Sequence, residues 1–435
     1  MKALDGRAAV RPPQSGERSM PPREAYARGL AAARELGLDA DESAVADVSP
    51  GAYACVLRRG GVPAFGGNGY GKGDPEPARA GALFEALEHY LSGLDGFTAD
   101  DLQLRSADEL ARGPLARDLA VALLAEAPAG PLGCMTAASA RTGEEVAVPV
   151  FLSVPDYVLP AGERLRREAG DAFDYTALQR YSFNNGWAAG VNPAEAIVHA
   201  VNEVVERDAL SLLLIDQFLG RRRRPLKIVD PATLPDELAL FLKHAGDVTG
   251  KPIHLIDMTT ELEIPAFLAF CPPDPGTPAR IRGCGASLSR ENAIRRALSE
   301  LIQLCLVDRC ASPEQKAEEL DGLPDLTVGY PVLRACRFAD FTPLLAGAER
   351  VAYVENDAPD TPEGHEDRLL DVLAAHGFEV YVRRHYTTGD IAVVNVFVPG
   401  MERFLLITDG VLVLPGGRGH VVRRHGMEAL RRPGS

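Results

Sequence analysis

The sequence predicts a mixed α/β fold in which long helices pack on mixed sheets. Short apolar segments such as AYACVLRR (52–59) and EEVAVPVFLSV (144–154) are typical of strands. Long apolar runs that follow a capping residue, such as the run after Asn192, are typical of buried helices. A helical pattern also occurs three times along the chain, which predicts internal repeats.

We expect one folded unit over residues 23–420, a flexible tail over 1–22 and a C-terminal tail over 421–435. In the first half we expect a helix over 23–36, a strand over 52–59, a Gly-rich turn over 66–73, a helix over 75–94, a helical region over 106–126 and a strand over 144–154. In the second half we expect a helix over 192–214, a helix in LPDELALFLKHAG, strands in PIHLIDMT and PAFLAFC, a helix and a strand in EDRLLDVLAAHGFEVYVRRH, and a strand in DIAVVNVFVPG.

The composition excludes some classes of partner. The formal net charge of −15 argues against nucleic acid or an anionic membrane as a general partner. The basic run Arg221–Arg224 is either a solvated helix end or a contact for an acidic partner or a phosphate. No apolar run is long enough to span a membrane, and the N-terminus does not resemble a signal peptide, so we expect a soluble, cytoplasmic protein. The seven cysteines lack a CxxC pair, which suits a reducing cytoplasm and predicts buried, inert thiols.

The threefold pattern is the most informative feature of the sequence. Its copies are DPEPARAGALFEALEHY from Asp74, NPAEAIVHAVNEVVERD from Asn192 and SRENAIRRALSELIQLC from Ser289. Each copy starts with a helix-capping residue, and each has alanines four and eight positions later. The positions eleven and fourteen residues after the start carry Glu85 and Glu88, Glu203 and Glu206, and Glu300 and Gln303.

These spacings place the side chains on one helix face. Alanines four residues apart form a smooth stripe that permits close helix approach, and the acidic pair continues the same face. Three such helices packed together would bring five carboxylates and one amide to one place. Buried carboxylates require positive partners, and Mg²⁺ prefers oxygen ligands and bridges to phosphates. The pattern therefore predicts a shared site for Mg²⁺ and a nucleotide. A single ExxE pair, by contrast, is usually a solvated helix face.

Other polar residues leave alternatives open. The stretch GGNGYGK matches GxxxxGK, but Gly73 stands where a P-loop requires Ser or Thr, so a P-loop is disfavoured. Lys72 either contacts a phosphate or is a surface lysine. Glu195 can simply match the helix dipole, whereas Arg207 and Arg296 can neutralise carboxylates or hold phosphate. His89 and His199 are expected to be packed rather than catalytic.

The same segments resemble the YcaO family of ATP-dependent peptide-modifying enzymes. The resemblance rests on GKGDPEPARAGALFEALEHY, NNGWAAGVNPAEAIVHAVNEVVERDA, GCGASLSRENAIRRALSELIQ and VVNVFVPGMERF, and it covers about residues 25–420. It implies a mixed α/β fold with pseudo-symmetry, the cofactors ATP and Mg²⁺, and a reaction in which ATP phosphorylates a backbone amide oxygen of a peptide. The metal ligands that it implies are Glu85, Glu88, Glu203, Glu206 and Glu300. The nucleotide contacts that it implies are Glu85, Glu88, Glu195, Arg207 and Gln303, to which the glycine-rich stretch adds Lys72.

The resemblance also implies a choice between products. Azoline-forming members cyclise a side chain of the peptide onto the activated amide, and thioamide-forming members use an external sulfide equivalent. The chain ends in RRPGS rather than in the Pro-rich tail typical of azoline-forming members, which favours a thioamide. We also expect a partner protein that presents the precursor peptide or supplies sulfur, and a homodimer is possible. The family pattern is not matched at His89, Ala188, Val191 and Cys305. These departures favour an alternative, a catalytically inactive scaffold that binds a nucleotide or presents a peptide.

Overall fold

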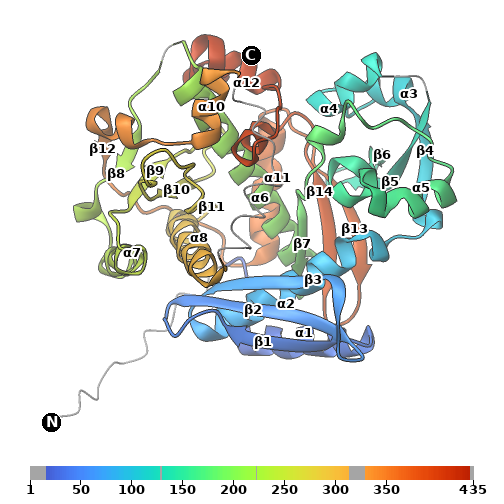
Figure 1. The fold of residues 1–435 in the computed structure, drawn as a ribbon, viewed down its shortest axis with the longest axis horizontal. Coiled ribbons are helices and arrows are strands. Elements are labelled where there is room, and N and C mark those ends of the chain that lie inside the picture. The colour runs from blue at the N-terminus through green and yellow to red at the C-terminus, as the bar shows by residue number, and fades with distance from the viewer. Residues whose placement is uncertain (1–15, 128–129, 222, 313–328, 432–435) are drawn as a thin grey trace.

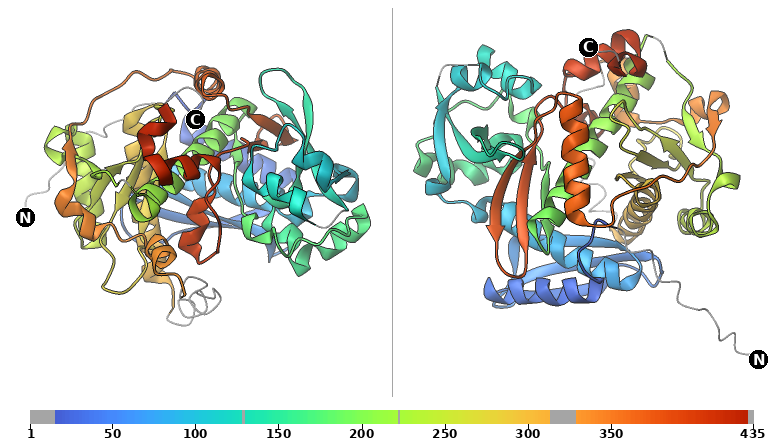
Figure 2. Two further views of the ribbon diagram at one scale, coloured as in Figure 1. Left: turned by 90° about the horizontal axis from the view of Figure 1, so that it is seen from above. Right: turned by 180° about the vertical axis from the view of Figure 1, so that it is seen from behind.

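The computed structural model describes residues 16–127, 130–221, 223–312 and 329–431. Figure 1 shows a base made of the N-terminal strands and two lobes above it, with the long helix α6 (Pro193–Leu214) between the lobes. Seen from behind, the helix α11 (Pro362–Ala375) lies beside α6 (Figure 2). The predicted mixed α/β fold is confirmed. Among the described residues, its strands form three sheets.

The base is a three-stranded antiparallel sheet in the order β1–β2–β3. Its strands are β1 (Asp39–Ala44), β2 (Gly51–Arg59) and β3 (Val62–Gly73). The helix α2 (Pro75–Ser92) packs on β2 and β3, and α1 (Pro22–Glu35) packs on α2. This arrangement places the first copy of the repeated pattern directly above the sheet.

The second sheet has the order β4–β5–β13–β14–β7, and β6 pairs with β5. Its strands are β4 (Leu102–Ser106), β5 (Pro131–Ser139), β6 (Glu145–Pro149), β7 (Trp187–Gly190), β13 (Tyr381–Thr387) and β14 (Ala392–Phe397). Three short helices complete this lobe, namely α3 (Ala107–Ala111), α4 (Leu119–Ala122) and α5 (Glu163–Ala169). The lobe joins the centre of the molecule through β7, which leads into α6.

The third sheet has the order β11–β10–β9–β8–β12. Its neighbours are antiparallel except for the parallel pair β8 and β12. Its strands are β8 (Lys227–Val229), β9 (His254–Asp257), β10 (Ala266–Phe270), β11 (Arg282–Ala286) and β12 (Glu349–Val351). Among the described residues, this lobe contains the helices α7 (Asp236–Thr249), α8 (Arg290–Cys310) and α10 (Pro331–Phe338), and α12 (Gly417–His425) lies near the C-terminus.

The three copies of the pattern form the helices α2, α6 and α8, as predicted. The side chain of Asn192 accepts a hydrogen bond from the backbone N–H of Glu195 at 2.9 Å, and Ser289 caps α8 in the same way. These caps satisfy backbone donors that a helix start leaves without partners. Asp74 makes no side-chain cap at the start of α2, but that helix begins at Pro75 as predicted, so the acidic positions of the three helices correspond.

The alanine faces do not bring the three helices against one another, and that expectation is wrong. Each face packs on the strand that precedes its helix: β3 before α2, β7 before α6 and β11 before α8. A Cβ added to Gly71 would lie 1.6 Å from the carbonyl oxygen of Ala78, and one added to Gly285 would lie 2.1 Å from that of Ala293. The repeated unit is therefore a strand and a helix in very close contact, which requires glycine on the strand and alanine on the helix.

Other expectations also require correction. The residues 66–73 are part of the strand β3, not a Gly-rich turn, because their glycines serve the contact with α2. The residues 106–126 form short helices instead of one helical region. Residues 16–21 are not a free tail: Glu17 is buried, and α1 begins at Pro22. The C-terminal residues up to 431 contain α12 and a short 3-10 helix (Met427–Arg431). Residues 1–15 and 432–435 lie outside the described residues.

Two hydrophobic cores hold these layers together. The larger core involves α6, which is buried along most of its length, and the smaller core lies between α7, α8 and the third sheet. Among the helices of the described residues, none is both long and apolar enough to cross a lipid bilayer. The position of α6 between the sheets brings its polar residues toward the centre of the molecule.

Candidate active site

A cavity of about 1740 Å³ lies between the base and the two lobes. All the candidate residues that the sequence singled out line it. They are Lys72, Glu85, Glu88, Glu195, Glu203, Glu206, Arg207, Glu300 and Gln303. The predicted convergence of the three helices is thus observed, although it occurs across a cavity and not in a helix bundle. The roles of these residues in binding a metal or a nucleotide stay predictions.

The glutamates of α2 are oriented by backbone groups of two neighbouring strands. Glu85 accepts a hydrogen bond from the backbone N–H of Tyr70 on β3 at 2.8 Å. Glu88 accepts one from the backbone N–H of Ala189 on β7 at 3.2 Å. Such bonds hold each carboxylate in one orientation and leave its remaining lone pairs toward the cavity.

The acidic pair of α6 lies among basic residues. Glu203 pairs with Arg207 at 2.9 Å and accepts a hydrogen bond from the backbone N–H of Gly186. Arg207 also donates to the carbonyl oxygen of Asn184, so its guanidinium is held at the cavity wall. Arg207 is thus able to neutralise a carboxylate and to face an anionic ligand at the same time.

The third helix joins the base through an ion pair. Glu300 on α8 lies 2.8 Å from the ammonium of Lys72 on β3, and it accepts a hydrogen bond from the backbone N–H of Cys284 at 3.4 Å. Lys72 is therefore neither a P-loop lysine nor an isolated surface residue. It is the positive partner of one of the predicted metal ligands.

The carboxylates influence one another strongly. Burial raises the pKa of Glu206 to about 7, and the charge of Glu300 adds to this effect. Burial also holds the pKa of Glu88 well above its ordinary value, and the charges of Glu203 and Glu85 raise it further. The pKa of Glu85 is likewise raised by burial. Burial is the largest cause of each shift, and a divalent cation bound beside these carboxylates would favour their charged form.

The described residues contain no cluster of three or more His, Cys, Asp or Glu side chains placed to hold a metal ion as they stand. Mg²⁺ commonly binds to one or two carboxylates and completes its shell with water and substrate phosphates. The arrangement of separate carboxylates around a large cavity fits such a shared ion better than a cage made of protein ligands alone. The donor set, which consists of carboxylate oxygens with nearby Lys and Arg, suits a magnesium nucleotide.

Residues 16–21 form part of the cavity wall, which the sequence did not predict. Arg18 lies 2.8 Å from Glu195, and the backbone N–H of Ser19 donates to the other oxygen of Glu195. Glu17 accepts hydrogen bonds from Asn202 and Ser287. Glu195 is thus a binding partner of the N-terminal segment as well as a charge at the helix start. A short polar segment beside prolines carries no periodic signal from which this contact could be predicted.

Two histidines also line the cavity. His199 accepts a hydrogen bond from Arg296 at 3.1 Å, and burial together with the charge of Arg296 holds its pKa well below the ordinary value, so it is neutral. His89 donates to the carbonyl oxygen of Asn68 at 2.7 Å. The expectation of packed histidines agrees with these contacts. The sequence missed Arg282 and Asp409, which line the cavity on the side of β11.

The cysteines are all free thiols, and six of them are buried as expected. Cys310 is the exception, because it is exposed at the end of α8. Cys284 lines the cavity, and burial holds its pKa well above the ordinary value, so the thiol is protonated. Cys305 is a buried residue of α8 in the smaller core, and Val191 is also buried. These two departures from the family pattern therefore concern packed side chains.

Comparisons with known proteins agree with this geometry. Residues 68–402 match the family model described as YcaO cyclodehydratase, ATP- and Mg²⁺-binding. An uncharacterised protein in the tfuA 3′ region of Rhizobium leguminosarum bv. trifolii is 29% identical over 233 residues, which are 50% of this chain and 52% of that protein. An uncharacterised protein of Methanothermobacter thermautotrophicus is 26% identical over 245 residues, which are 51% of this chain and 56% of that protein. The chain thus spans about half the length of these curated relatives.

Solved structures show the same fold. The structure of YcaO from Methanopyrus kandleri bound with AMPPCP and Mg²⁺ superposes with a TM-score of 0.60 at 20% identity, covering 92% of this chain and 96% of that chain. A heterocyclase in complex with substrate and cofactor superposes with a TM-score of 0.59 at 22% identity, covering 89% of this chain and 53% of that chain. The predicted cofactors, ATP and Mg²⁺, are those that the matching family model names.

Proposed function

This chain belongs to the YcaO family, and on that premise we propose that it is an ATP- and Mg²⁺-dependent enzyme that activates a backbone amide of a ribosomally made peptide. The observation that carries the proposal is the convergence of glutamates from α2, α6 and α8 on one cavity that also contains Lys72 and Arg207. Carboxylates gathered beside Lys72 and Arg207 suit a magnesium nucleotide, because the metal ion favours their charged form and the cations face the phosphates.

The residues divide into two groups in this proposal. The glutamates Glu85, Glu88, Glu203, Glu206 and Glu300 hold Mg²⁺, directly or through water. The residues Lys72, Glu195, Arg207 and Gln303 contact the nucleotide, together with Glu85 and Glu88. When bound, ATP supplies a phosphoryl group that converts the amide oxygen of the peptide into a leaving group. The cavity residues position the peptide carbonyl and neutralise charge, which is the main contribution of a protein to phosphoryl transfer.

The product is a thioamide or an azoline. In both cases a nucleophile forms a bond to the amide carbon, and the carbon–oxygen bond breaks with release of phosphate. An external sulfide equivalent gives the thioamide, whereas a Cys, Ser or Thr side chain of the peptide gives the azoline. A partner protein that presents the peptide or supplies sulfur is part of the proposal. The name of the Rhizobium relative places it beside tfuA, so the product of a neighbouring gene is the first partner to test.

The first test is ATP binding measured by calorimetry with Mg²⁺. We expect Glu203→Gln and Glu300→Gln to weaken binding at least tenfold each, because each removes a charge that holds the metal. Glu24→Gln on the exposed face of α1 is the matched control and should bind as the wild type does. If both cavity variants bind ATP normally, the three helices do not share a nucleotide site.

The second test is mass spectrometry of candidate peptides after incubation with ATP, Mg²⁺ and the partner. A thioamide is heavier than the starting amide by the difference between sulfur and oxygen, and an azoline is lighter by one water. ATP consumption without any change of peptide mass, for every peptide and partner tried, would contradict amide activation.

A second candidate function is a scaffold that binds a nucleotide or presents a peptide without catalysis. It is favoured by His89, which lines the cavity at a position where the family commonly has Arg. The buried Cys305 and Val191 give it less support, because they do not remove a charged group from the cavity wall. Detection of modified peptide with the purified chain, and its loss with Glu203→Gln, would rule out the scaffold.

A further inference from the structure

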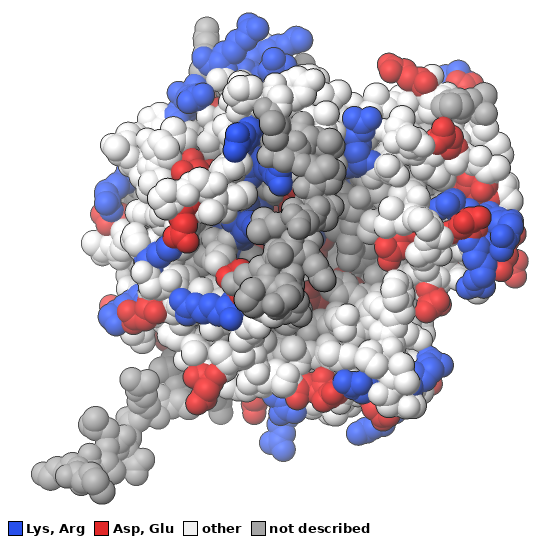
Figure 3. All heavy atoms as spheres, in the orientation of Figure 1, with Lys and Arg blue, Asp and Glu red and all other residues white. Residues whose placement is uncertain are grey.

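A group of arginines gathers around the C-terminal helix, although the chain as a whole is acidic. Figure 3 shows basic side chains clustered at the top of the molecule, where Figure 1 places α12 and the C-terminus. Two segments supply them: the residues that follow α6, and the last residues of the described chain. We name as the basic surface the exposed residues Arg221, Arg223, Arg224, Arg423, Arg424 and Arg431.

Contacts between the two segments show that the basic surface is continuous. The backbone N–H of Arg221 donates to the carbonyl oxygen of Arg423 at 3.2 Å. Arg224 forms an ion pair with Glu428, whose pKa is lowered chiefly by this bond and further by the charges of Arg431 and Lys227. Glu428 is therefore outnumbered by its basic neighbours, and the surface keeps a positive charge.

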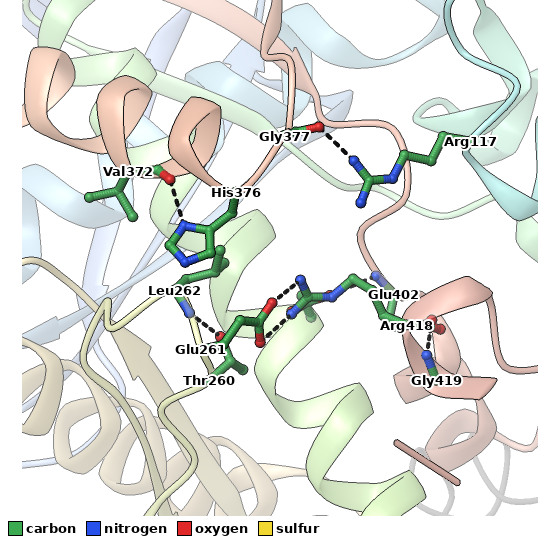
Figure 4. A network of polar contacts seen from close by, with 11 residues as sticks. Arg117, Thr260, Glu261, Leu262, Val372, His376, Gly377, Glu402, Arg418 and Gly419 are labelled. Atoms are coloured by element: carbon green, nitrogen blue, oxygen red, sulfur yellow. Dashed lines mark hydrogen bonds and ion pairs between the residues drawn. The ribbon is translucent and has the colours of Figure 1, made fainter. Parts of the chain in front are cut away.

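The helix α12, which carries Arg423 and Arg424, is held by buried charged side chains, as Figure 4 shows. Glu402 accepts hydrogen bonds from the backbone N–H groups of Gly416 and Gly419, at 2.8 Å and 2.6 Å, and so caps the start of α12. Arg418 on α12 forms two hydrogen bonds with Glu261 and a third with Asp208 at 3.0 Å. All these charged side chains are buried. The backbone of α12 is thus fixed, which lowers the entropic cost of binding a partner through Arg423 and Arg424.

The basic surface is also connected to the cavity. The helix α6 carries Glu203, Glu206 and Arg207 in its middle and continues through a π-helical turn (Ile215–Leu219) to Arg221. Asp208, which binds Arg418, directly follows Arg207 in the chain. None of the six arginines is among the residues that line the cavity. A partner on this surface would therefore leave the cavity open.

We propose that the basic surface docks an acidic segment of the partner protein that the proposed function requires. The choice of a protein partner rests on the proposed function, whereas the need for an acidic ligand follows from the arginines alone. Arginine forms paired hydrogen bonds with carboxylates, so several arginines on one rigid surface suit a run of Asp or Glu. A long polyanion such as nucleic acid would also meet the acidic remainder of the chain, which repels it.

The test is fluorescence anisotropy of the full chain with a labelled Glu-rich decapeptide, at low and at moderate salt. Comparison ligands are a Gln-rich decapeptide, a single-stranded DNA decamer and anionic lipid vesicles. Arg423→Glu/Arg424→Glu and Arg221→Glu/Arg223→Glu each reverse two charges, one pair in each segment. Arg164→Glu/Arg167→Glu on the exposed face of α5 is the matched control.

We expect the Glu-rich peptide to bind more tightly than the other ligands. Its affinity should fall as the salt concentration rises. Each variant of the basic surface should weaken binding about tenfold or more, because opposite charges become like charges. The control should bind as the wild type does, and ATP binding should be unchanged in all three variants. If the DNA or the vesicles bind more tightly, if the Glu-rich peptide does not bind, or if the control loses as much affinity, the proposal is wrong. Because ATP binding is measured on the same samples, failure of the docking surface can be told apart from failure of the proposed function.

Discussion

The ammonium of Lys72 lies 2.8 Å from a carboxylate oxygen of Glu300, and this ion pair joins β3 to α8 across one side of the cavity. Burial lowers the pKa of Lys72, but Glu300 and other carboxylates outweigh burial and raise it, so the side chain is charged. The pair thus links the first and third copies of the repeated unit. It also places a cation where the phosphates of a nucleotide would lie in the proposed function.

Substitution of Lys72 tests this position. We expect Lys72→Met to weaken binding of ATP with Mg²⁺ about tenfold, because a point charge next to a phosphate is lost. Lys243→Met on α7 is a suitable control, since Lys243 is exposed and pairs only with Asp247 among the ion pairs of the described residues. Calorimetry on both variants gives the comparison. Unchanged or tighter binding in Lys72→Met would mean that Lys72 only neutralises Glu300.

The close contact between β3 and α2 predicts that one methyl group added at Gly71 will destabilise the fold strongly. A Cβ at position 71 would lie 1.6 Å from the carbonyl oxygen of Ala78, and backbone atoms cannot move aside as a side chain can. We expect Gly71→Ala to lower the free energy of unfolding by about 2–4 kcal/mol. Gly389→Ala, where a Cβ meets nothing within 4 Å, should change it by less than about 0.5 kcal/mol. Urea denaturation measures both, and equal stability of the two variants would refute the close contact.

The buried carboxylate of Asp171 predicts a change of stability without a change of function. Its Oδ2 atom accepts hydrogen bonds from the hydroxyl groups of Tyr157 and Tyr175, both at 2.6 Å, and from the backbone N–H of Gly133 at 2.8 Å. We expect Tyr175→Phe to lower the free energy of unfolding by about 1 kcal/mol. Asp171→Ala should lower it by about 3 kcal/mol, because this substitution leaves buried hydrogen-bond donors without partners. ATP affinity should not change in either variant. A loss of ATP affinity would show that this lobe is coupled to the cavity.

The cap of α12 predicts a dependence of stability on pH. Burial raises the pKa of Glu402 from an ordinary 4.5 to about 7, although the N–H groups of Gly416 and Gly419 lower it in part. Between these values the folded protein keeps a proton that the unfolded chain releases. The free energy of unfolding should therefore fall as pH rises from about 4.5 to about 7, by up to about 3 kcal/mol from this group.

Glu402→Gln removes this titration and should make the fall with pH smaller. Asp208, whose pKa burial raises to about 6, remains in both proteins and contributes in the same direction. Urea denaturation at several pH values from 5 to 8 gives the comparison. An identical fall in the wild type and in Glu402→Gln would show that the carboxyl of Glu402 does not titrate in this range.

The repeated pattern and nine residues of the cavity wall could be predicted from local patterns in the sequence. Helix caps and apolar spacing depend on residues close together in the chain, so the starts of α2, α6 and α8 and the register of their glutamates could be predicted. The shared register then implied that Glu85, Glu203 and Glu300 occupy equivalent positions. Their presence in one cavity agrees with that inference.

The packing partners of each element could not be predicted from the sequence. The alanine faces lie on strands, although the sequence predicts that they pack helix against helix. Residues 16–21 contact Glu195, although the sequence predicts a flexible tail there. Arg418 joins Asp208 to Glu261. These contacts join residues that are far apart in the chain, and such pairs produce no periodic pattern. The sequence predicts a turn at the glycines of β3 because glycine is required equally by tight turns and by close backbone contacts. The packing of the whole chain distinguishes the two uses.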